Sequence, residues 1–144
     1  MYFAKDGGRF LQPHAFRREA LVCASTHDLP TLKGWWNAND VAERVRARRA
    51  TKKSAAGQRE EREADKRLLL QALVQAQLLP GDLEAALQQT AMSDEVLIDI
   101  HRYLARTPSR LFAVQIDDAL GSVEQANLPG TCLLYTSPSP RDRS

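Results

Sequence analysis

Two short apolar segments, far apart along the chain, have the length and composition of buried strands. Residues 20–25 read ALVCAS and residues 110–115 read RLFAVQ. Continuous apolar runs of this length are typical of strands buried on both faces, as in a parallel sheet covered by helices. We therefore predict that the two segments lie close together and parallel, buried in one sheet.

The residues between these two segments have the spacing of helices. Asp40 is expected to be the N-cap of a basic helix over about residues 41–49. Gly57 is expected to break this pattern, and a longer helix is predicted over about residues 58–77. The Leu-Pro-Gly-Asp sequence at residues 79–82 is expected to end that helix and to start a short one through about residue 89.

Apolar side chains recur every three or four positions in two of the predicted helices, and they indicate which faces are buried. The longer helix is expected to bury Leu69, Ala72, Leu73 and Ala76. A later helix, capped by Ser93 and ended by Pro108, is expected to bury Val96, Leu97, Ile100, Tyr103 and Leu104. At the N-terminus, residues 1–10 are predicted to form two short strands around a turn at Asp6, Gly7 and Gly8.

The predicted order of elements is strand, loop, several helices and strand. This order corresponds to one βαβ-like unit with an enlarged helical insertion, which implies a parallel pairing and a right-handed crossover. Two or three strands cannot bury both faces of a sheet by themselves. The fold class expected is therefore α/β, mostly helical with a few short strands, as one slice of a larger α/β protein.

Composition places the 144-residue chain among ordinary globular proteins, with 43% hydrophobic and 26% charged residues. No apolar run approaches the roughly 18 residues of a membrane span. Lys5 and Asp6 stand where a signal peptide needs an apolar core, so nothing suggests secretion. The two cysteines, Cys23 and Cys132, are interpreted as free thiols. We expect a cytoplasmic protein.

Positive charge is concentrated in one part of the chain. Residues 44–67 contain ten of the 20 Lys and Arg residues, against four acidic residues. Such a run can form a nucleic-acid-binding surface, and it is more often one solvated face of a helix. The second interpretation is favoured because no aromatic residue for base stacking lies within the run.

Thr26 separates the first predicted strand from a pair of polar residues, His27 and Asp28. A carboxylate at the end of a buried strand can face a pocket and hold hydroxyl groups through charge-assisted hydrogen bonds. His27 can add a donor, and Trp35 or Trp36 can offer an apolar wall to a sugar. The alternative is that Asp28 only caps a turn and that both tryptophans belong to the core.

Other kinds of chemistry find no support in the sequence. His14, His27 and His101 have no metal-ligand spacing, so no metal site is expected. The chain has no glycine-rich phosphate loop and no serine or cysteine nucleophile motif. No cofactor is therefore expected.

The sequence CASTHDLPTLKGWW, residues 23–36, closely resembles a segment of the bacterial 4-alpha-glucanotransferases (amylomaltase, or disproportionating enzyme). In that family this segment contains the His-Asp motif of the alpha-amylase clan. Residues 1–21 and 118–131 resemble the segments before the motif and after the last barrel strand, in the same order. The resemblance implies that residues 1–131 are a C-terminal slice of a (β/α)8 TIM barrel with a helical insertion.

The family transfers α-1,4-glucan segments from maltooligosaccharide donors to glucose or maltodextrin acceptors with retention of configuration. The resemblance implies a catalytic role for Asp28, whose carboxylate would hydrogen-bond the hydroxyls of the sugar at the cleavage point. It implies substrate-binding roles for His27 and Asn127. The family's nucleophile and acid/base lie before the segment that resembles residue 1, so the chain alone is expected to be inactive. No nucleic-acid or membrane partner is expected.

Residues 132–144, CLLYTSPSPRDRS, do not resemble the end of the family's sequences. They are interpreted as an unrelated, disordered or artefactual tail, with a natural divergent tail as the alternative. Two rival functions stay open for the chain as a whole. One is a basic helical nucleic-acid-binding module, and the other is a non-catalytic glucan-binding fragment.

Overall fold

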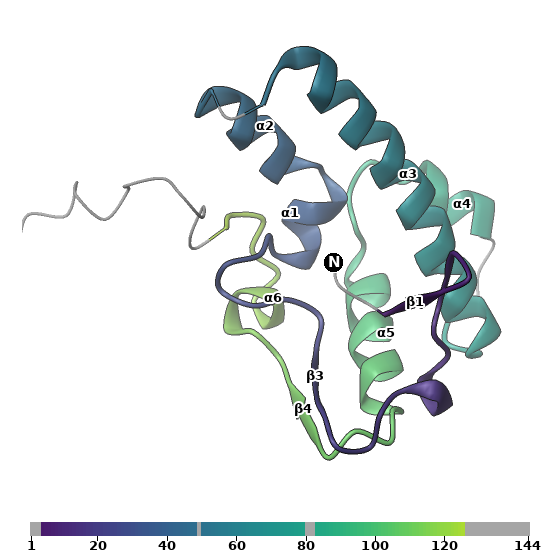
Figure 1. Ribbon diagram of the computed structural model, residues 1–144. Helices are drawn as coiled ribbons and strands as arrows, with labels where there is room; N and C mark the ends of the chain where they lie inside the picture. Colours follow the sequence, from purple (N-terminus) through teal and green to yellow (C-terminus); the bar gives the residue numbers. More distant parts are fainter. Residues whose placement is uncertain (1–3, 49, 80–82, 126–144) are drawn as a thin grey trace, which may run out of the picture.

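A computed structural model describes residues 4–48, 50–79 and 83–125. Figure 1 shows a mostly helical chain with two small sheets. In chain order the strands are β1 (Lys5–Asp6), β2 (Arg9–Phe10), β3 (Leu21–Cys23) and β4 (Leu111–Ala113). The α-helices are α1 (Leu32–Trp36), α2 (Asn39–Arg46), α3 (Lys52–Gln75), α4 (Leu83–Gln88), α5 (Asp94–Ala105) and α6 (Ile116–Ala119), and a 3-10 helix covers Pro13–Ala15.

The N-terminal strands form the predicted hairpin. β1 and β2 are antiparallel, with Lys5 opposite Phe10. Gly7 and Gly8 have φ angles of 54° and 79°, which are left-handed values that glycine adopts without a steric penalty. The Lys5 ammonium lies 2.5 Å from the carboxylate of Asp65 in α3, so the hairpin is tied to the long helix.

The second sheet is the parallel pair β3–β4, and the predicted pairing is confirmed. Leu21 lies opposite Leu111, and Val22 lies opposite Phe112. All the helices from α1 to α5 lie between these strands in the sequence, as expected for a βαβ-like unit with a helical insertion. The α/β class predicted from the sequence is therefore confirmed.

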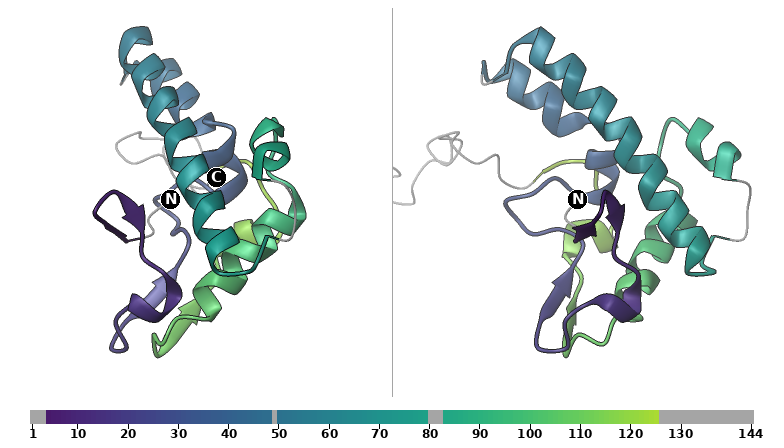
Figure 2. Two further views of the ribbon diagram at one scale, coloured as in Figure 1. Left: turned by 90° about the vertical axis from the view of Figure 1, so that its right-hand side faces the viewer. Right: turned by 45° about the vertical axis from the view of Figure 1, so that its right-hand side comes forward.

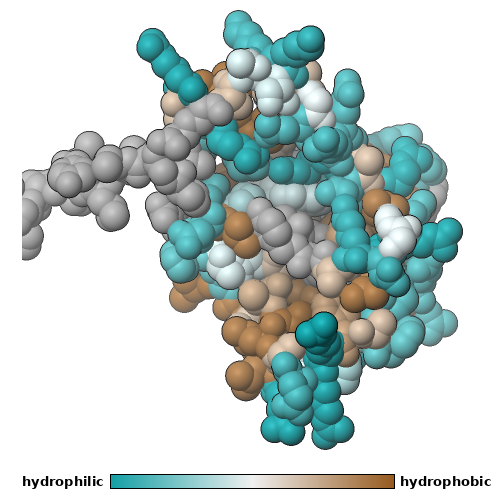
Figure 3. All heavy atoms as spheres, in the orientation of Figure 1, coloured by the Kyte–Doolittle hydropathy of each residue, from teal (hydrophilic) through white to brown (hydrophobic). Residues whose placement is uncertain are grey.

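The predicted burial of both strands is wrong for the described residues. Val22 is buried, whereas Leu21 is 60%, Leu111 63% and Phe112 40% exposed. The reason is that a two-stranded sheet has two open edges, and the described residues supply no second layer for its outer face. Figure 3 shows apolar side chains gathered over the lower part of the molecule, where β3 and β4 lie in Figure 1.

Helix α2 starts at Asn39, two residues earlier than expected, and Asp40 is not its N-cap. Ala38 occupies the cap position with a φ of 55° and no side-chain cap. Asp40 lies in the first turn and is buried, with its carboxylate 3.0 Å from Arg62 and 2.6 Å from Arg44. The carboxylate thus pairs with Arg44 of α2 and with Arg62 of α3 instead of satisfying the free N–H groups at the start of its helix.

Helix α3 is continuous over 24 residues, so the break predicted at Gly57 is wrong. The Thr51 hydroxyl accepts a hydrogen bond from the Ser54 N–H and caps the true start of the helix. A glycine inside a helix costs about 1 kcal/mol relative to alanine, and this cost is small beside the burial of Leu69 and Leu73 further along. The charged stretch before residue 58 is helical for this reason.

The core forms where α3 and α5 pack together. α3 contacts α2, α4, α5 and β2, and Figure 2 shows it crossing the whole molecule. The buried faces predicted for α3 and α5 are confirmed, except that Ala76 is partly buried and follows the end of α3. The Ser93 hydroxyl caps α5 by accepting from the Val96 N–H at 3.2 Å, as predicted.

We expect the isolated 144-residue chain to be poorly soluble and to lack a sharp thermal transition. Six apolar side chains on and near β3, β4 and α6 are at least 40% exposed: Leu21, Leu111, Phe112, Val114, Ile116 and Leu120. Exposed apolar surface and open strand edges favour association between chains. Dye binding to apolar surface and light scattering will test this. A cooperative melt in a monomeric chain that binds no dye would contradict it.

Candidate functional site

The turn that carries His27 and Asp28 lies directly beyond the parallel strands. β3 ends at Cys23. The next two residues, Ala24 and Ser25, are buried, and residues 26–31 then lead into α1. The Leu29 N–H donates to the Thr26 carbonyl at 2.9 Å and closes the turn. Both polar residues therefore stand at the carboxyl end of the sheet, where parallel α/β folds place their ligands.

The side chains of His27 and Asp28 contact each other at the molecular surface. His27 Nε2 lies 3.2 Å from Asp28 Oδ2, and the two side chains are 77% and 50% exposed. A polar contact this exposed contributes little to stability, because water competes for both partners. The pair is thus accessible to a ligand, with a carboxylate that accepts hydrogen bonds and an imidazole that can donate one.

The turn is held by residues near the end of the chain that the sequence did not point to. Asp118 in α6 is 1% exposed, and its carboxylate accepts hydrogen bonds from the Ser25 hydroxyl and from the Leu32 N–H. The Gln125 amide donates to the backbone carbonyl of Asp28 at 3.2 Å. No local pattern in the sequence signals such contacts, because an acidic residue in a short polar segment is normally exposed.

The tryptophans belong to the core, so the alternative of packing is confirmed over sugar contact. Trp35 is 4% and Trp36 1% exposed. The Arg62 guanidinium lies 4.8 Å from the centre of the Trp35 ring, and Lys66 Nζ lies 5.1 Å from that of Trp36. Each ring is covered by a cation from α3 as well as by apolar neighbours, which leaves no face for a sugar.

Asn127 lies outside the described residues, and its predicted role in substrate binding stays a prediction. The boundary expected at Thr131 and the tail of residues 132–144 also lie outside them. Within the described part of the chain, no group of three His, Cys, Asp or Glu side chains is placed to hold a metal ion. None of the helices described there is both long and apolar enough to cross a membrane.

The basic run of α2 and α3 is partly engaged in contacts within the chain. Arg44 and Arg62 pair with Asp40, Lys66 pairs with Glu63, and Arg67 lies 3.8 Å from Glu84. These contacts are those of a helical surface neutralised by its own acidic neighbours. They favour the solvated-face interpretation over a nucleic-acid-binding surface, which needs cations directed at phosphates.

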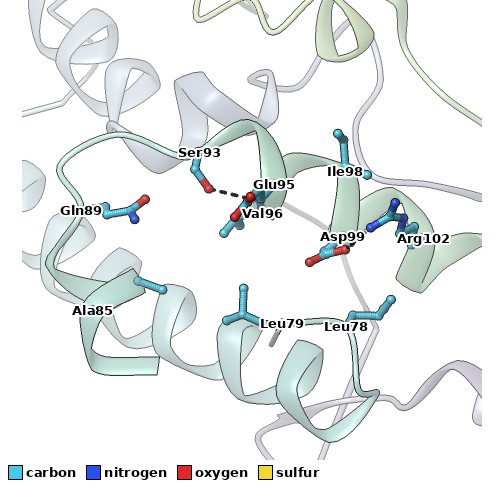
Figure 4. Close-up of a pocket in the computed structure, with 11 residues that line it drawn as sticks. Leu78, Leu79, Ala85, Gln89, Ser93, Glu95, Val96, Ile98, Asp99 and Arg102 are labelled. Atoms are coloured by element: carbon cyan, nitrogen blue, oxygen red, sulfur yellow. Dashed lines mark hydrogen bonds and ion pairs between the residues drawn. The ribbon is translucent and has the colours of Figure 1, made fainter. Parts of the chain in front are cut away.

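A hollow of about 590 Å³ lies between the end of α3, α4 and α5 (Figure 4). Its walls combine apolar side chains such as Leu78, Leu79 and Ile98 with the ion pair of Asp99 and Arg102. No residue of the 26–31 turn lines it, and it offers no aromatic surface for a sugar. We therefore place the candidate site at the turn and not in this hollow.

Burial raises the pKa of Tyr103 in α5 to about 12. Its hydroxyl donates a hydrogen bond to the carbonyl of Leu11. Tyr103 therefore stays protonated at neutral pH and holds the segment after the hairpin against α5, which is a structural role.

Comparison with known proteins decides which family these features belong to. The family model described as 4-alpha-glucanotransferase matches residues 1–136. The chain belongs to this family. The resemblance seen in residues 23–36 and in the two flanking segments is thereby confirmed.

Individual members of the family agree with this assignment. The chain is 31% identical over 135 residues to a 4-alpha-glucanotransferase of Haemophilus influenzae, covering 94% of this chain and 19% of that protein. It is 33% identical over 136 residues to one of Mycobacterium tuberculosis, covering 91% of this chain and 18% of that protein. The chain thus spans about a fifth of the length of these relatives.

A solved structure of the family shares the fold of the chain. The crystal structure of amylomaltase from Corynebacterium glutamicum superposes with a TM-score of 0.75 at 26% sequence identity. The match covers 85% of this chain and 18% of the amylomaltase chain. The described helices and strands therefore have the arrangement of one portion of a 4-alpha-glucanotransferase.

Proposed function

We propose that the chain forms the C-terminal slice of the (β/α)8 barrel of a 4-alpha-glucanotransferase. The complete enzyme transfers α-1,4-glucan segments from maltooligosaccharide donors to glucose or maltodextrin acceptors. The observation that carries this proposal is the accessible His27–Asp28 pair, which lies beyond the carboxyl end of β3 in a chain of this family. Catalytic groups of such barrels lie at this end of the strands.

The exposed apolar surface of β3 and β4 supports the barrel. In a closed barrel each strand pairs on both edges and is covered by an outer ring of helices. Leu21 and Leu111, which are 60% and 63% exposed here, would be covered by neighbouring strands and helices of the complete enzyme. The parallel pairing of β3 and β4 across a helical insertion is the geometry that adjacent barrel strands require.

In this proposal Asp28 hydrogen-bonds the hydroxyls of the sugar and does not itself attack or protonate the glycosidic bond. Retaining transfer uses one carboxylate as nucleophile and another as acid/base, and its transition state resembles an oxocarbenium ion. We assign both of these groups to parts of the enzyme outside the 144 residues. Asp28 accepts hydrogen bonds from sugar hydroxyls, and these bonds strengthen as the ring distorts, which lowers the barrier.

His27 and Asn127 are assigned to substrate binding. The imidazole of His27 lies against the Asp28 carboxylate, so one sugar can contact both side chains. A hydrogen bond donated by the His27 imidazole binds the substrate in the ground state and the transition state alike. Cys23 is a free thiol, which is compatible with the reducing cytoplasm that we propose as the location.

The test is an assay of the full-length protein that carries this segment. Incubated with maltotriose, it should release glucose together with maltooligosaccharides longer than the substrate, and the new bonds should be α-linked. The isolated 144-residue chain should give no product. A folded full-length protein that forms no longer oligosaccharides, or an isolated chain that does, would overturn the proposal.

A further inference from the structure

We infer that Asp118 is a positioning residue that holds the His27–Asp28 turn in its working shape. This inference rests on the proposed role of Asp28. Asp118 belongs to α6, the short helix that follows β4, and its side chain is buried. It does not contact the surface on which a glucan would lie, so its effect on catalysis is transmitted through the turn.

The two ends of the turn are joined by the single carboxylate of Asp118. Oδ2 accepts a hydrogen bond from the hydroxyl of Ser25, the residue just before the turn. Oδ1 accepts one at 2.7 Å from the N–H of Leu32, the first residue of α1 after it. Residues 26–31 are thus closed into a loop whose ends are fixed to two oxygens of one rigid group.

Neighbouring contacts make the same connection stiffer. The side-chain oxygen of Gln115, the residue before α6, lies 2.7 Å from the Ser25 hydroxyl and is a second acceptor for its single proton, beside Asp118. The Gln125 amide donates to the Asp28 carbonyl at 3.2 Å. A Cβ atom at Gly34 would lie only 2.5 Å from the Val123 carbonyl oxygen, so α1 packs directly against the chain after α6. Figure 1 shows α6 next to the turn, at the same end of the β3–β4 pair.

Joining two segments through a buried carboxylate costs free energy, so its presence suggests that the geometry it fixes is important. Burial of a charge is unfavourable, and hydrogen bonds to the carboxylate must offset it. Such charge-assisted bonds are short and directional, so they fix atoms more tightly than apolar packing does. A group that contacts the reacting sugar must be held in place, because a shift of about 1 Å at a reacting centre can lower the rate by about 100-fold.

The experiment is a double-mutant cycle in the full-length enzyme. Asp118→Ala is expected to lower kcat by about 10- to 100-fold, with KM changed by less than about 3-fold. Asp118→Asn keeps one acceptor oxygen for the Leu32 N–H and should recover much of that loss. Glu95→Ala, which removes an exposed carboxylate in the first turn of α5, away from the 26–31 turn, is the control and should leave kcat within about 2-fold.

The decisive measurement is the loss of kcat caused by Asp118→Ala, compared between the parent enzyme and the Asp28→Asn variant. If Asp118 acts through Asp28, Asp118→Ala should cost much less on the Asp28→Asn background than alone. A fully additive loss would overturn the inference, because it would show that Asp118 affects activity independently of Asp28. If Asp118→Ala does not fold, the same cycle with Ser25→Ala, which removes the hydroxyl that donates to Asp118, decides between the two outcomes.

The single variants separate failure of this inference from failure of the proposed function. If Asp28→Asn abolishes turnover while folded Asp118→Ala keeps it, the positioning role alone is overturned. If Asp28→Asn itself keeps normal turnover, the proposed function of the turn fails first.

Discussion

Asp28→Asn in the full-length enzyme is expected to lower kcat by about 100- to 1,000-fold while glucan binding changes little. The substitution preserves the shape of the side chain and one acceptor oxygen, and it removes the negative charge. A charge-assisted contact made mainly in the transition state is worth roughly 3 to 4 kcal/mol, on the scale of one oxyanion-hole donor. Initial rates of glucose release from maltotriose, with binding measured separately by calorimetry, will check this.

The neighbouring histidine, which contacts the same carboxylate at 3.2 Å, provides a variant for comparison. His27→Ala should cost less in kcat and should also raise KM, because the hydrogen bond that the imidazole donates contributes to binding in both states. If Asp28→Asn retains near-normal turnover in a folded protein, Asp28 is only a turn residue. Its exposure would then have no catalytic meaning.

Trp36→Ala is expected to lower the free energy of unfolding of the full-length enzyme by about 3 to 5 kcal/mol. The ring is 1% exposed and packs under Lys66, so its removal leaves a cavity that the surrounding helices cannot fill. Its indole N–H also loses its contact with the Gln89 carbonyl, 3.4 Å away. Urea unfolding followed by circular dichroism will measure the change.

The control for Trp36 is a substitution that keeps most of the apolar volume. Trp36→Phe should destabilise less than Trp36→Ala, since it leaves a smaller cavity. Stability within about 1 kcal/mol of the parent for Trp36→Ala, together with weaker maltooligosaccharide binding, would contradict the structural role. Such a result would support the alternative role of Trp36 in sugar binding.

Local chemistry made several elements predictable from the sequence. The capping Ser93 and the regular spacing from Val96 to Leu104 define α5, because both signals act within one or two turns of a helix. The parallel pairing of residues 20–25 and 110–115 followed from their apolar character and from the helices between them. The position of His27 and Asp28 at the end of β3 followed from the same reasoning.

The errors arose where distant contacts override local preference. Asp40 has the chemistry of an N-cap, yet its carboxylate forms a tertiary ion pair with Arg62, 22 positions away, in addition to a local one with Arg44. Gly57 does not break α3, because the free-energy cost of one glycine is small beside the burial of apolar side chains later in the same helix. Asp118 could not be found at all from the sequence, since its partners lie 86 and 93 positions away.

The distance in sequence between Asp118 and the turn has a consequence for how the site forms. The His27–Asp28 motif is synthesised before the carboxylate that closes its loop, which arrives 86 residues after Leu32. Contacts between such distant residues form late in folding, because the loop they close must first lose its conformational entropy. A nascent chain that ends before α6 therefore carries the complete motif without its geometry. We therefore expect docking of α6 to be the step that fixes the turn in the geometry proposed for glucan binding.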